Sequence, residues 1–191
     1  PVMFVDFTGY GSTYVFAYNN SGSLVPLNQF AENSAYFKIN DVNYSKVSSM
    51  STFKTAWNNM EGSIYNVFLY LHGGLGCLWF LNETVLTESI TAQLNKKTIT
   101  GHIFLFSCYG GEGSEGENLA WALAKKCNAK VVACTVGVSY TNLLWMGYYA
   151  RVGKEWFFNL KSYWFEYSYV NGKAIRNKWS PKWCNLSNGS L

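Results

Sequence analysis

One pattern occurs twice in the chain, in VFLYLHGG (67–74) and in IFLFSCYGG (103–111). Each segment is an unbroken apolar run that ends in a reactive side chain followed by glycines. A third apolar run, VVACT (131–135), has no such ending, and helix-like segments at about 83–94 and 115–127 lie between the runs. Continuous apolar strands that alternate with helices are typical of a parallel sheet covered on both faces. We therefore predict an α/β fold with a mainly parallel central sheet flanked by helices.

The reactive residues at the ends of the first two runs are His72 and Cys108. In parallel sheets, ligands bind outside the carboxyl ends of the strands. We therefore expect both side chains on the rim where chemistry takes place. His102 begins its strand, so it is expected at the opposite edge of the sheet, with a structural role.

The chemistry that this pair predicts is nucleophilic. A cysteine thiol is only about 3% ionised at pH 7 if its pKa is ordinary, so it needs an activating partner. His72 can take the proton of the Cys108 thiol and later give a proton to a leaving amine. The N–H groups of Gly73 and Cys108 are candidates for an oxyanion hole. Ser114 and Glu117 have capping-box spacing, which predicts a helix N-terminus close to the nucleophile.

The other cysteines are interpreted as structural, because a lone cysteine at a strand end is usually a small buried apolar side chain. They are Cys77, Cys127, Cys134 and Cys184. An α/β-hydrolase also uses a His-Gly-Gly segment, but that fold needs its histidine after the nucleophile in the chain. No histidine follows His102, and Phe106 stands where the nucleophile elbow needs glycine, so this alternative is poor.

The composition of the chain bears on several other classes of protein and binding site. The chain has 191 residues, 49% apolar and 14% charged, so burial can offset the entropy of ordering and disorder is excluded. The net charge of +4 comes without a dense basic block, which argues against nucleic-acid binding. No stretch reaches the roughly 18 apolar residues of a membrane span. Two histidines and five cysteines without a Cys-x-x-Cys pair lack the spacing of a zinc site, so neither a metal nor a cofactor is expected.

The other segments give weaker signals. Further strands are expected at residues 3–6, 13–18, 42–47 and 77–81. A helix is expected at 52–60, capped by Ser51. Beyond Ser139 the periodicity is irregular, and the aromatic stretch 156–169 fits a helix passing into a strand.

The two strand ends resemble the clan CD cysteine peptidases. These include caspases, gingipains, clostripain, separase, CHAT proteases and the autoprocessing domains of bacterial toxins. The matching text is VFLYLHGG (67–74) and IFLFSCYGG (103–111), and VVACT (131–135) is similar to the next core strand. The resemblance spans about residues 40–150 and implies a caspase-like sandwich.

By this resemblance, His72 and Cys108 form the catalytic dyad, and the Gly73 N–H contributes to the oxyanion hole. Ser107 matches the family's small residue before the nucleophile. The segment Phe106-Ser107-Cys108 lacks the glutamine of caspases, so specificity for aspartate is not implied.

Phe106, Ser107 and Glu112 are the residues expected to contact a substrate. Glu112 lies with Glu115 and Glu117 just after the nucleophile, where these carboxylates would repel a substrate aspartate. A neutral or basic residue is therefore expected at P1, and an apolar one could pack on Phe106.

The amino end, PVMFVDFTG (1–9), resembles the closing segment of an Rhs-repeat core, with Phe7 in place of the usual proline. Pro1, in place of an initiating methionine, suggests a piece cut from a longer polypeptide. The resemblance implies that residues 1–26 are the end of such a core, folded as a hairpin. Residues 27–191 would then be a caspase-like peptidase domain with an aromatic, basic extension.

Together the two resemblances imply a secreted or delivered bacterial effector, toxin or autoprocessing domain that acts in a reducing cytoplasm. Its leading function is that of a cysteine endopeptidase on a protein or peptide substrate, with an immunity or chaperone protein as a further partner. Two alternatives stay open. One is a catalytically inactive binding module on the same fold, and the other is a toxin that acts on nucleic acid.

Overall fold

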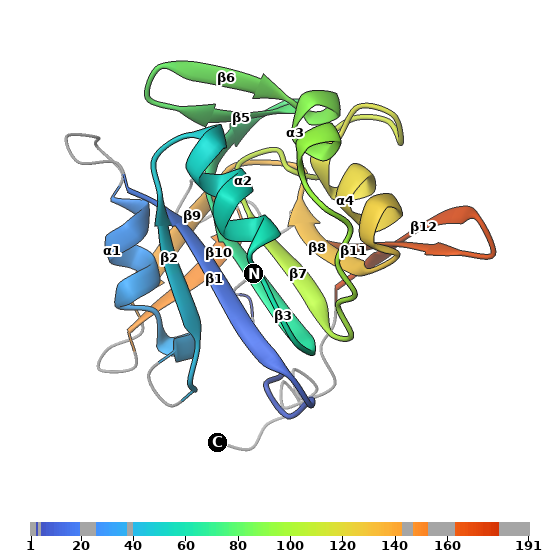
Figure 1. Ribbon diagram of the computed structural model, residues 1–191. Helices are drawn as coiled ribbons and strands as arrows, with labels where there is room; N and C mark the ends of the chain where they lie inside the picture. Colours follow the sequence, from blue (N-terminus) through green and yellow to red (C-terminus); the bar gives the residue numbers. More distant parts are fainter. Residues whose placement is uncertain are drawn as a thin grey trace.

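The computed structural model describes residues 3, 5–19, 26–37, 40–142, 147–152 and 163–179. Within these residues, seven strands form the central sheet of an α/β fold (Figure 1). From edge to edge they are β12 (Lys173–Lys178), β11 (Trp164–Val170), β8 (Lys130–Cys134), β7 (His102–Phe106), β3 (Ile64–Tyr70), β1 (Ser12–Tyr18) and β2 (Asn43–Val47). The strands from β8 to β2 are parallel, as predicted. Because β11 runs antiparallel to β8 and to β12, the sheet as a whole is mixed.

The three apolar runs form adjacent strands in the middle of this sheet. Their side chains are almost all buried, because the strands are covered on both faces. Strand β3 pairs with β7 in a register that sets Tyr70 opposite Phe106. His72 and Cys108 each follow these residues by two positions in the chain. Both therefore lie just beyond a strand end, at the same rim of the sheet.

One face of the sheet is covered by helices (Figure 1). They are α2 (Met50–Asn58), α3 (Thr87–Gln93) and α4 (Leu119–Cys127). On this face Phe53 and Trp57 of α2 pack against Phe16 of β1, with ring centroids 5.8 and 6.3 Å away. The predicted cap of α2 is wrong, because Ser49 accepts the capping hydrogen bond and Ser51 lies inside the helix.

The opposite face carries a layer of aromatic rings. It is covered by α1 (Leu27–Glu32), the 3-10 turn η1 (Ala35–Phe37) and the hairpin of β9 (Val138–Asn142) and β10 (Tyr148–Val152). Tyr36 of η1 stacks on Phe68, which in turn stacks on Phe104 at 4.8 Å. Tyr140 of β9 stacks on Tyr70 at 5.7 Å. The expectation of helices on both faces is therefore only half right, since a hairpin and a single turn cover much of this side.

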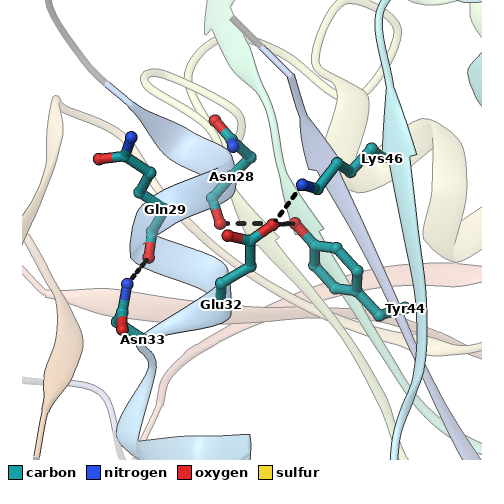
Figure 2. A network of polar contacts seen from close by, with 6 residues as sticks. All are labelled: Asn28, Gln29, Glu32, Asn33, Tyr44 and Lys46. Carbon is teal, nitrogen blue, oxygen red and sulfur yellow. Dashed lines mark hydrogen bonds and ion pairs between the residues drawn. The ribbon is translucent and has the colours of Figure 1, made fainter. Parts of the chain in front are cut away.

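Helix α1 is held on the sheet edge by polar contacts with β2 (Figure 2). The Lys46 Nζ atom lies 2.7 Å from the Glu32 carboxylate, and the Tyr44 hydroxyl donates to the same carboxylate at 3.3 Å. These contacts fix a helix of only six residues, which could not hold its position by helical propensity alone. The fixed helix presents Phe30 and Leu27 to the site described below.

The hairpin expected within residues 1–26 is wrong. Strand β1 pairs in parallel with β2 and β3, so it lies inside the central sheet. Among the described residues of the segment 3–6, none is in a strand. The Met3 N–H instead donates to the carbonyl of Ala150 in β10, and Met3 is fully buried in the common core.

A small antiparallel sheet follows β3 at the top of Figure 1. It consists of β4 (His72–Gly74), β5 (Cys77–Phe80) and β6 (Glu83–Leu86). The helix expected at 83–94 is therefore wrong in its first turn, because residues 83–86 pair with β5 and only Thr87–Gln93 is helical. The first strand of this small sheet begins at His72, so the sheet determines where the imidazole lies.

The described ranges contain neither a helix that could span a membrane nor a cluster of metal-ligating side chains. Within them, no helix is both long enough and apolar enough to cross a membrane, and no three His, Cys, Asp or Glu side chains gather as metal ligands. Cys184 and residues 156–162 of the aromatic stretch lie outside the described residues, whereas the rest of that stretch belongs largely to β11.

Candidate active site

A cavity of about 270 Å³ opens at the carboxyl ends of β3 and β7. Its walls come from these strand ends, from the small sheet, from β9 and from α1. The lining residues are Leu27, Leu71, His72, Gly73, Trp79, Phe106, Cys108, Tyr109, Val138 and Tyr140. None of them is Asp, Glu, Lys or Arg, so the wall is largely apolar and carries two reactive groups, an imidazole and a thiol.

Cys108 lies in the turn directly after β7 and is partly exposed. The Val138 N–H of β9 donates a hydrogen bond to its Sγ atom at 3.3 Å. Among the described residues, no backbone carbonyl accepts a hydrogen bond from the N–H of Cys108.

His72 lies at the start of β4, with its ring edge-on to Tyr18 at a centroid distance of 5.5 Å. Its Nε2 atom is buried and has no hydrogen-bond partner among the described residues. Burial lowers the pKa of His72 below the usual value of 6.5, because an apolar wall disfavours the imidazolium ion. The ring is therefore neutral at pH 7 and has the basic lone pair that a proton acceptor needs. No hydrogen bond joins it to Cys108 within the described set, and catalytic hydrogen bonds often form only when substrate binds.

Gly73 lies against the backbone of Ser107 and Cys108. A methyl group at this position would collide with the Ser107 hydroxyl and would approach the carbonyl oxygens of Cys77 and Cys108 to 3.0 and 3.3 Å. Only glycine fits here without a shift, so the close approach of β4 to the Cys108 turn explains the glycine after His72.

Two of the three expected substrate contacts are not on the cavity wall. Phe106 lines the cavity, whereas Ser107 is 1% exposed behind Gly73 and its hydroxyl has no partner among the described residues. Glu112 is exposed and lies outside the lining. The sequence pattern misplaced both because a side chain next to a nucleophile in the chain can point to the other side of a turn.

The helix terminus predicted beside the nucleophile is also wrong. Helix α4 begins after Asn118, whose side chain accepts from the Trp121 N–H and whose amide donates to the carbonyls of Gly111 and Gly113. Ser114 and Glu117 bond to each other in a turn that precedes the helix.

The glutamates after the nucleophile consequently face elsewhere. Glu117 bonds to Ser114, and Glu115 accepts a hydrogen bond from Tyr169 at 2.6 Å. Like-charge repulsion from these carboxylates therefore does not govern the cavity. Its apolar wall disfavours a charged substrate side chain for a different reason, the free energy of desolvation.

Sequence reasoning missed Val138 and Tyr140, the contributions of β9. The five residues of β9 alternate Val, Ser, Tyr, Thr and Asn, a period of two that signals a strand but does not reveal what the strand packs against. It also missed that Tyr109 has a left-handed backbone with φ of 57°, fixed by the hydrogen bond of its N–H to the Val136 carbonyl. Such strained residues cluster at functional sites.

The remaining described cysteines differ from Cys108. Cys127 and Cys134 are buried, and burial raises the pKa of both thiols, that of Cys134 to about 12. Cys77 is partly exposed and accepts a hydrogen bond from the Trp79 indole at 3.1 Å.

His102 lies at the opposite rim, as predicted. Its Nε2 atom lies 2.8 Å from the Glu166 carboxylate, which also lies 3.6 Å from Lys130 Nζ. The Trp179 ring covers the imidazole at 4.6 Å. This histidine therefore ties β11 to β7 across β8.

The fold and the site together define an α/β protein with a thiol and a neutral imidazole in one apolar cavity at the carboxyl rim of its parallel strands. No model of a protein family matches the chain, and no curated protein matches it either.

Proposed function

We propose that this chain is a cysteine peptidase of caspase-like architecture in which Cys108 is the nucleophile and His72 the general base. One observation carries the proposal. Cys108 and His72 line the same cavity at the carboxyl ends of two neighbouring parallel strands, and the buried Nε2 atom of His72 has no partner among the described residues.

Acylation begins with attack of Cys108 Sγ on the carbonyl carbon of a peptide bond. The thiol proton passes to His72 Nε2, and the electron pair of the C=O bond moves to the oxygen. The Cys108 N–H, which has no described backbone acceptor, and the Gly73 N–H donate to this oxyanion. When the intermediate collapses, the C–N bond breaks and His72 returns its proton to the leaving amine.

In deacylation, His72 takes a proton from water and then gives one to the Cys108 sulfur. A water molecule gives a proton to His72 and attacks the thioester carbonyl, and the Cys108 sulfur leaves with the returned proton. The lowered pKa of His72 suits this cycle, because the ring must start each half-reaction neutral. For this proposed cycle, we expect activity to fall only below pH 6.5 on the acid side.

The cavity wall supports a preference for substrates with a neutral apolar side chain. Phe106, Leu71 and Val138 offer apolar contacts, and the described wall contains no cation to pair with a substrate carboxylate. A charged side chain would lose hydration without gaining a partner, which is unfavourable by several kcal/mol in an apolar environment. The expected preference is therefore apolar over Asp and over Arg.

The test is cleavage of denatured casein and of a peptide library varied at P1, each followed by mass spectrometry. The wild type is expected to cleave after apolar residues, and Cys108→Ala to be inactive. Cys77→Ala is the matched control, because Cys77 is also partly exposed at this rim. If casein is not cut, or if the Cys108 variant cuts equally well, the peptidase proposal is wrong.

A second candidate, a non-catalytic binding module, is favoured by an exposed apolar surface on the small sheet. Its large exposed side chains are Leu75, Trp79, Leu81 and Leu86. Exposed apolar patches of this kind mark interaction surfaces. A pull-down that depends on Leu81 and Trp79 but not on Cys108 would favour this candidate, provided that no peptidase activity is found.

The delivery of the chain as a bacterial effector is part of the same proposal and has the resemblance of residues 1–9 as its support. Expression of residues 1–191 inside a bacterial cytoplasm tests it. Growth arrest by the wild type, relieved by Cys108→Ala, is expected for a peptidase toxin. Arrest that persists with Cys108→Ala would contradict a peptidase toxin and favour another toxic activity, such as one on nucleic acid.

A further inference from the structure

A second unpartnered polar group lies in the cavity that holds the dyad. The hydroxyl of Tyr140 is buried and has no hydrogen-bond partner among the described residues, and its side chain lines the same wall as Cys108 and His72. Buried hydroxyls are nearly always hydrogen-bonded, because an unmet donor loses its hydration without return. Two residues of the cavity wall therefore each carry a buried polar atom without a partner among the described residues, the hydroxyl of Tyr140 and Nε2 of His72.

Strand β9 places Tyr140 on the wall of the cavity that Cys108 also lines. Residues two apart in a strand project to the same face, so Tyr140 lies on the same face of β9 as Val138. Val138 itself lines the cavity, and its N–H is bonded to Cys108 Sγ. Strand β9 therefore supplies both the Val138 N–H that bonds to the Cys108 sulfur and the Tyr140 ring with its unpartnered hydroxyl.

The ring of Tyr140 cannot easily turn away to find a partner. It stacks on Phe30 of α1 at 4.6 Å and on Tyr70 of β3 at 5.7 Å. Helix α1 is itself held to β2 by the contacts of Figure 2. A donor fixed in this way needs no reorganisation during a reaction, which is the property that makes an oxyanion hole effective.

The protonation state of Tyr140 also fits a donor. Burial, and then the neighbouring Tyr70 and Cys108 groups, raise its pKa well above 10. The hydroxyl therefore keeps its proton at any pH where a peptidase works, and it donates a hydrogen bond without transferring the proton.

We infer that the Tyr140 hydroxyl is a catalytic hydrogen-bond donor to the carbonyl oxygen of the substrate, acting beside the N–H of Cys108. This inference rests on the proposed peptidase function and adds a side-chain donor to a site otherwise built from backbone N–H groups. The peptide bond supplies what the cavity lacks, since its carbonyl accepts from Tyr140 while its nitrogen receives a proton from His72.

The experiment compares Tyr140→Phe with Tyr36→Phe, two changes that each remove one buried hydroxyl. Tyr36 is a satisfied structural tyrosine, because its hydroxyl donates to the Met3 carbonyl at 2.8 Å and accepts from the Ala150 N–H at 3.1 Å. The probe is a peptide aldehyde with an apolar terminal residue. It forms a bond from Cys108 Sγ to the aldehyde carbon, while the thiol proton moves to the aldehyde oxygen.

Tyr140→Phe is expected to lower kcat by about 10²-fold, as loss of one oxyanion donor does, with KM little changed. Its affinity for the aldehyde should fall by at least about tenfold, while its Tm stays equal or rises because no hydrogen bond is lost. Tyr36→Phe should show the reverse, a lower Tm with unchanged aldehyde affinity.

Alkylation of Cys108 by iodoacetamide separates failure of this inference from failure of the peptidase proposal, because that reaction develops no oxyanion. If the wild type neither cleaves peptides nor binds the aldehyde, the peptidase proposal is wrong. If the wild type does both and Tyr140→Phe matches it in kcat and in aldehyde affinity, the inference about Tyr140 is wrong. Equal alkylation rates in both proteins, together with weaker aldehyde binding by the variant, support it.

Discussion

The two histidines of this chain stand at opposite rims of the same parallel strands, and their surroundings differ in kind. His102 bonds to Glu166 at 2.8 Å, with Lys130 close to the same carboxylate. His72 is in an apolar cavity, and its buried Nε2 atom has no partner among the described residues.

The surroundings of His102 suit a structural histidine, whereas those of His72 support the reactive role proposed for it. A satisfied polar group stabilises the fold that satisfies it, whereas an unsatisfied buried group lowers the stability of the fold and gains a partner if a ligand binds to it. At the carboxyl rim, His72 and Tyr140 are both unsatisfied beside Cys108. We therefore expect substitutions at this rim to change activity more than stability and those at the other rim to do the opposite.

The largest expected effect is on catalysis. His72→Ala should lower kcat/KM by about 10²–10⁴-fold, because it removes the general base. His102→Ala should keep most of the activity, since His102 lies at the other rim and contacts Glu166. Kinetics on one fluorogenic peptide with an apolar P1 residue compare the two. Equal activity of His72→Ala and the wild type would contradict the role of His72 as general base.

The next effect concerns the close approach of β4 to the Cys108 turn. Gly73→Ala should destabilise the fold by about 1–3 kcal/mol, as overpacking does, and should also displace the nucleophile. Gly116→Ala is the matched control, because a methyl group there has nothing within 4 Å, and it should stay within about 0.5 kcal/mol. Urea denaturation measures both. A Gly73→Ala protein as stable and active as the wild type would contradict the packing of Gly73 on Ser107.

A smaller effect is expected from the ion pair at the other rim. The hydrogen bond from His102, and then electrostatic attraction to His102 and Lys130, lower the pKa of Glu166 despite its burial. The stability that the ionised Glu166 carboxylate gives to the fold is therefore present above about pH 4.5. It is lost as the pH falls through the lowered pKa of Glu166. Glu166→Gln should reduce the free energy of unfolding at pH 7 by about 0.5–1.5 kcal/mol. The exposed Glu112→Gln is the control, and equal losses in both variants would contradict a special role for Glu166.

The smallest effect is the pH dependence contributed by His72. Because burial lowers its pKa in the folded state, the unfolded chain binds more protons below about pH 6.5 and the wild type loses stability there. His72→Gln should lack this loss. Urea denaturation at pH 7.5 and 5.5 compares the two proteins, and the difference between them isolates His72. An identical loss in both would show that the imidazole is not desolvated.

The central strands and their two reactive ends could be predicted from the sequence because the information is local. The unbroken apolar runs identify β3 and β7 as buried parallel strands, and parallel pairing then brings His72 and Cys108 to one rim. The Cys108 contact with Val138 and the shared cavity with Tyr140 join residues about 30 positions apart through β9. No local pattern contains that information.

Local signals also failed where two interpretations compete. Ser114 and Glu117 have the spacing of a capping box, yet they bond within a turn, and Asn118 caps the helix instead. Residues 83–94 have apolar spacing compatible with a helix, but pairing with β5 makes the first four a strand. In the first case a local cap at Asn118 sets the helix start, and in the second the pairing with β5 outweighs a helical preference of a few tenths of a kcal/mol per residue.

The most direct test of the central claim is the alkylation rate of each cysteine by iodoacetamide at pH 7, followed by mass spectrometry. Cys77 is the internal reference, since it is partly exposed like Cys108. The activated thiol predicts that Cys108 reacts at least about tenfold faster than Cys77, and that His72→Ala abolishes this advantage while His102→Ala preserves it. A Cys108 that reacts no faster than Cys77, with a rate indifferent to His72→Ala, would contradict the claim that the two residues form a reactive dyad.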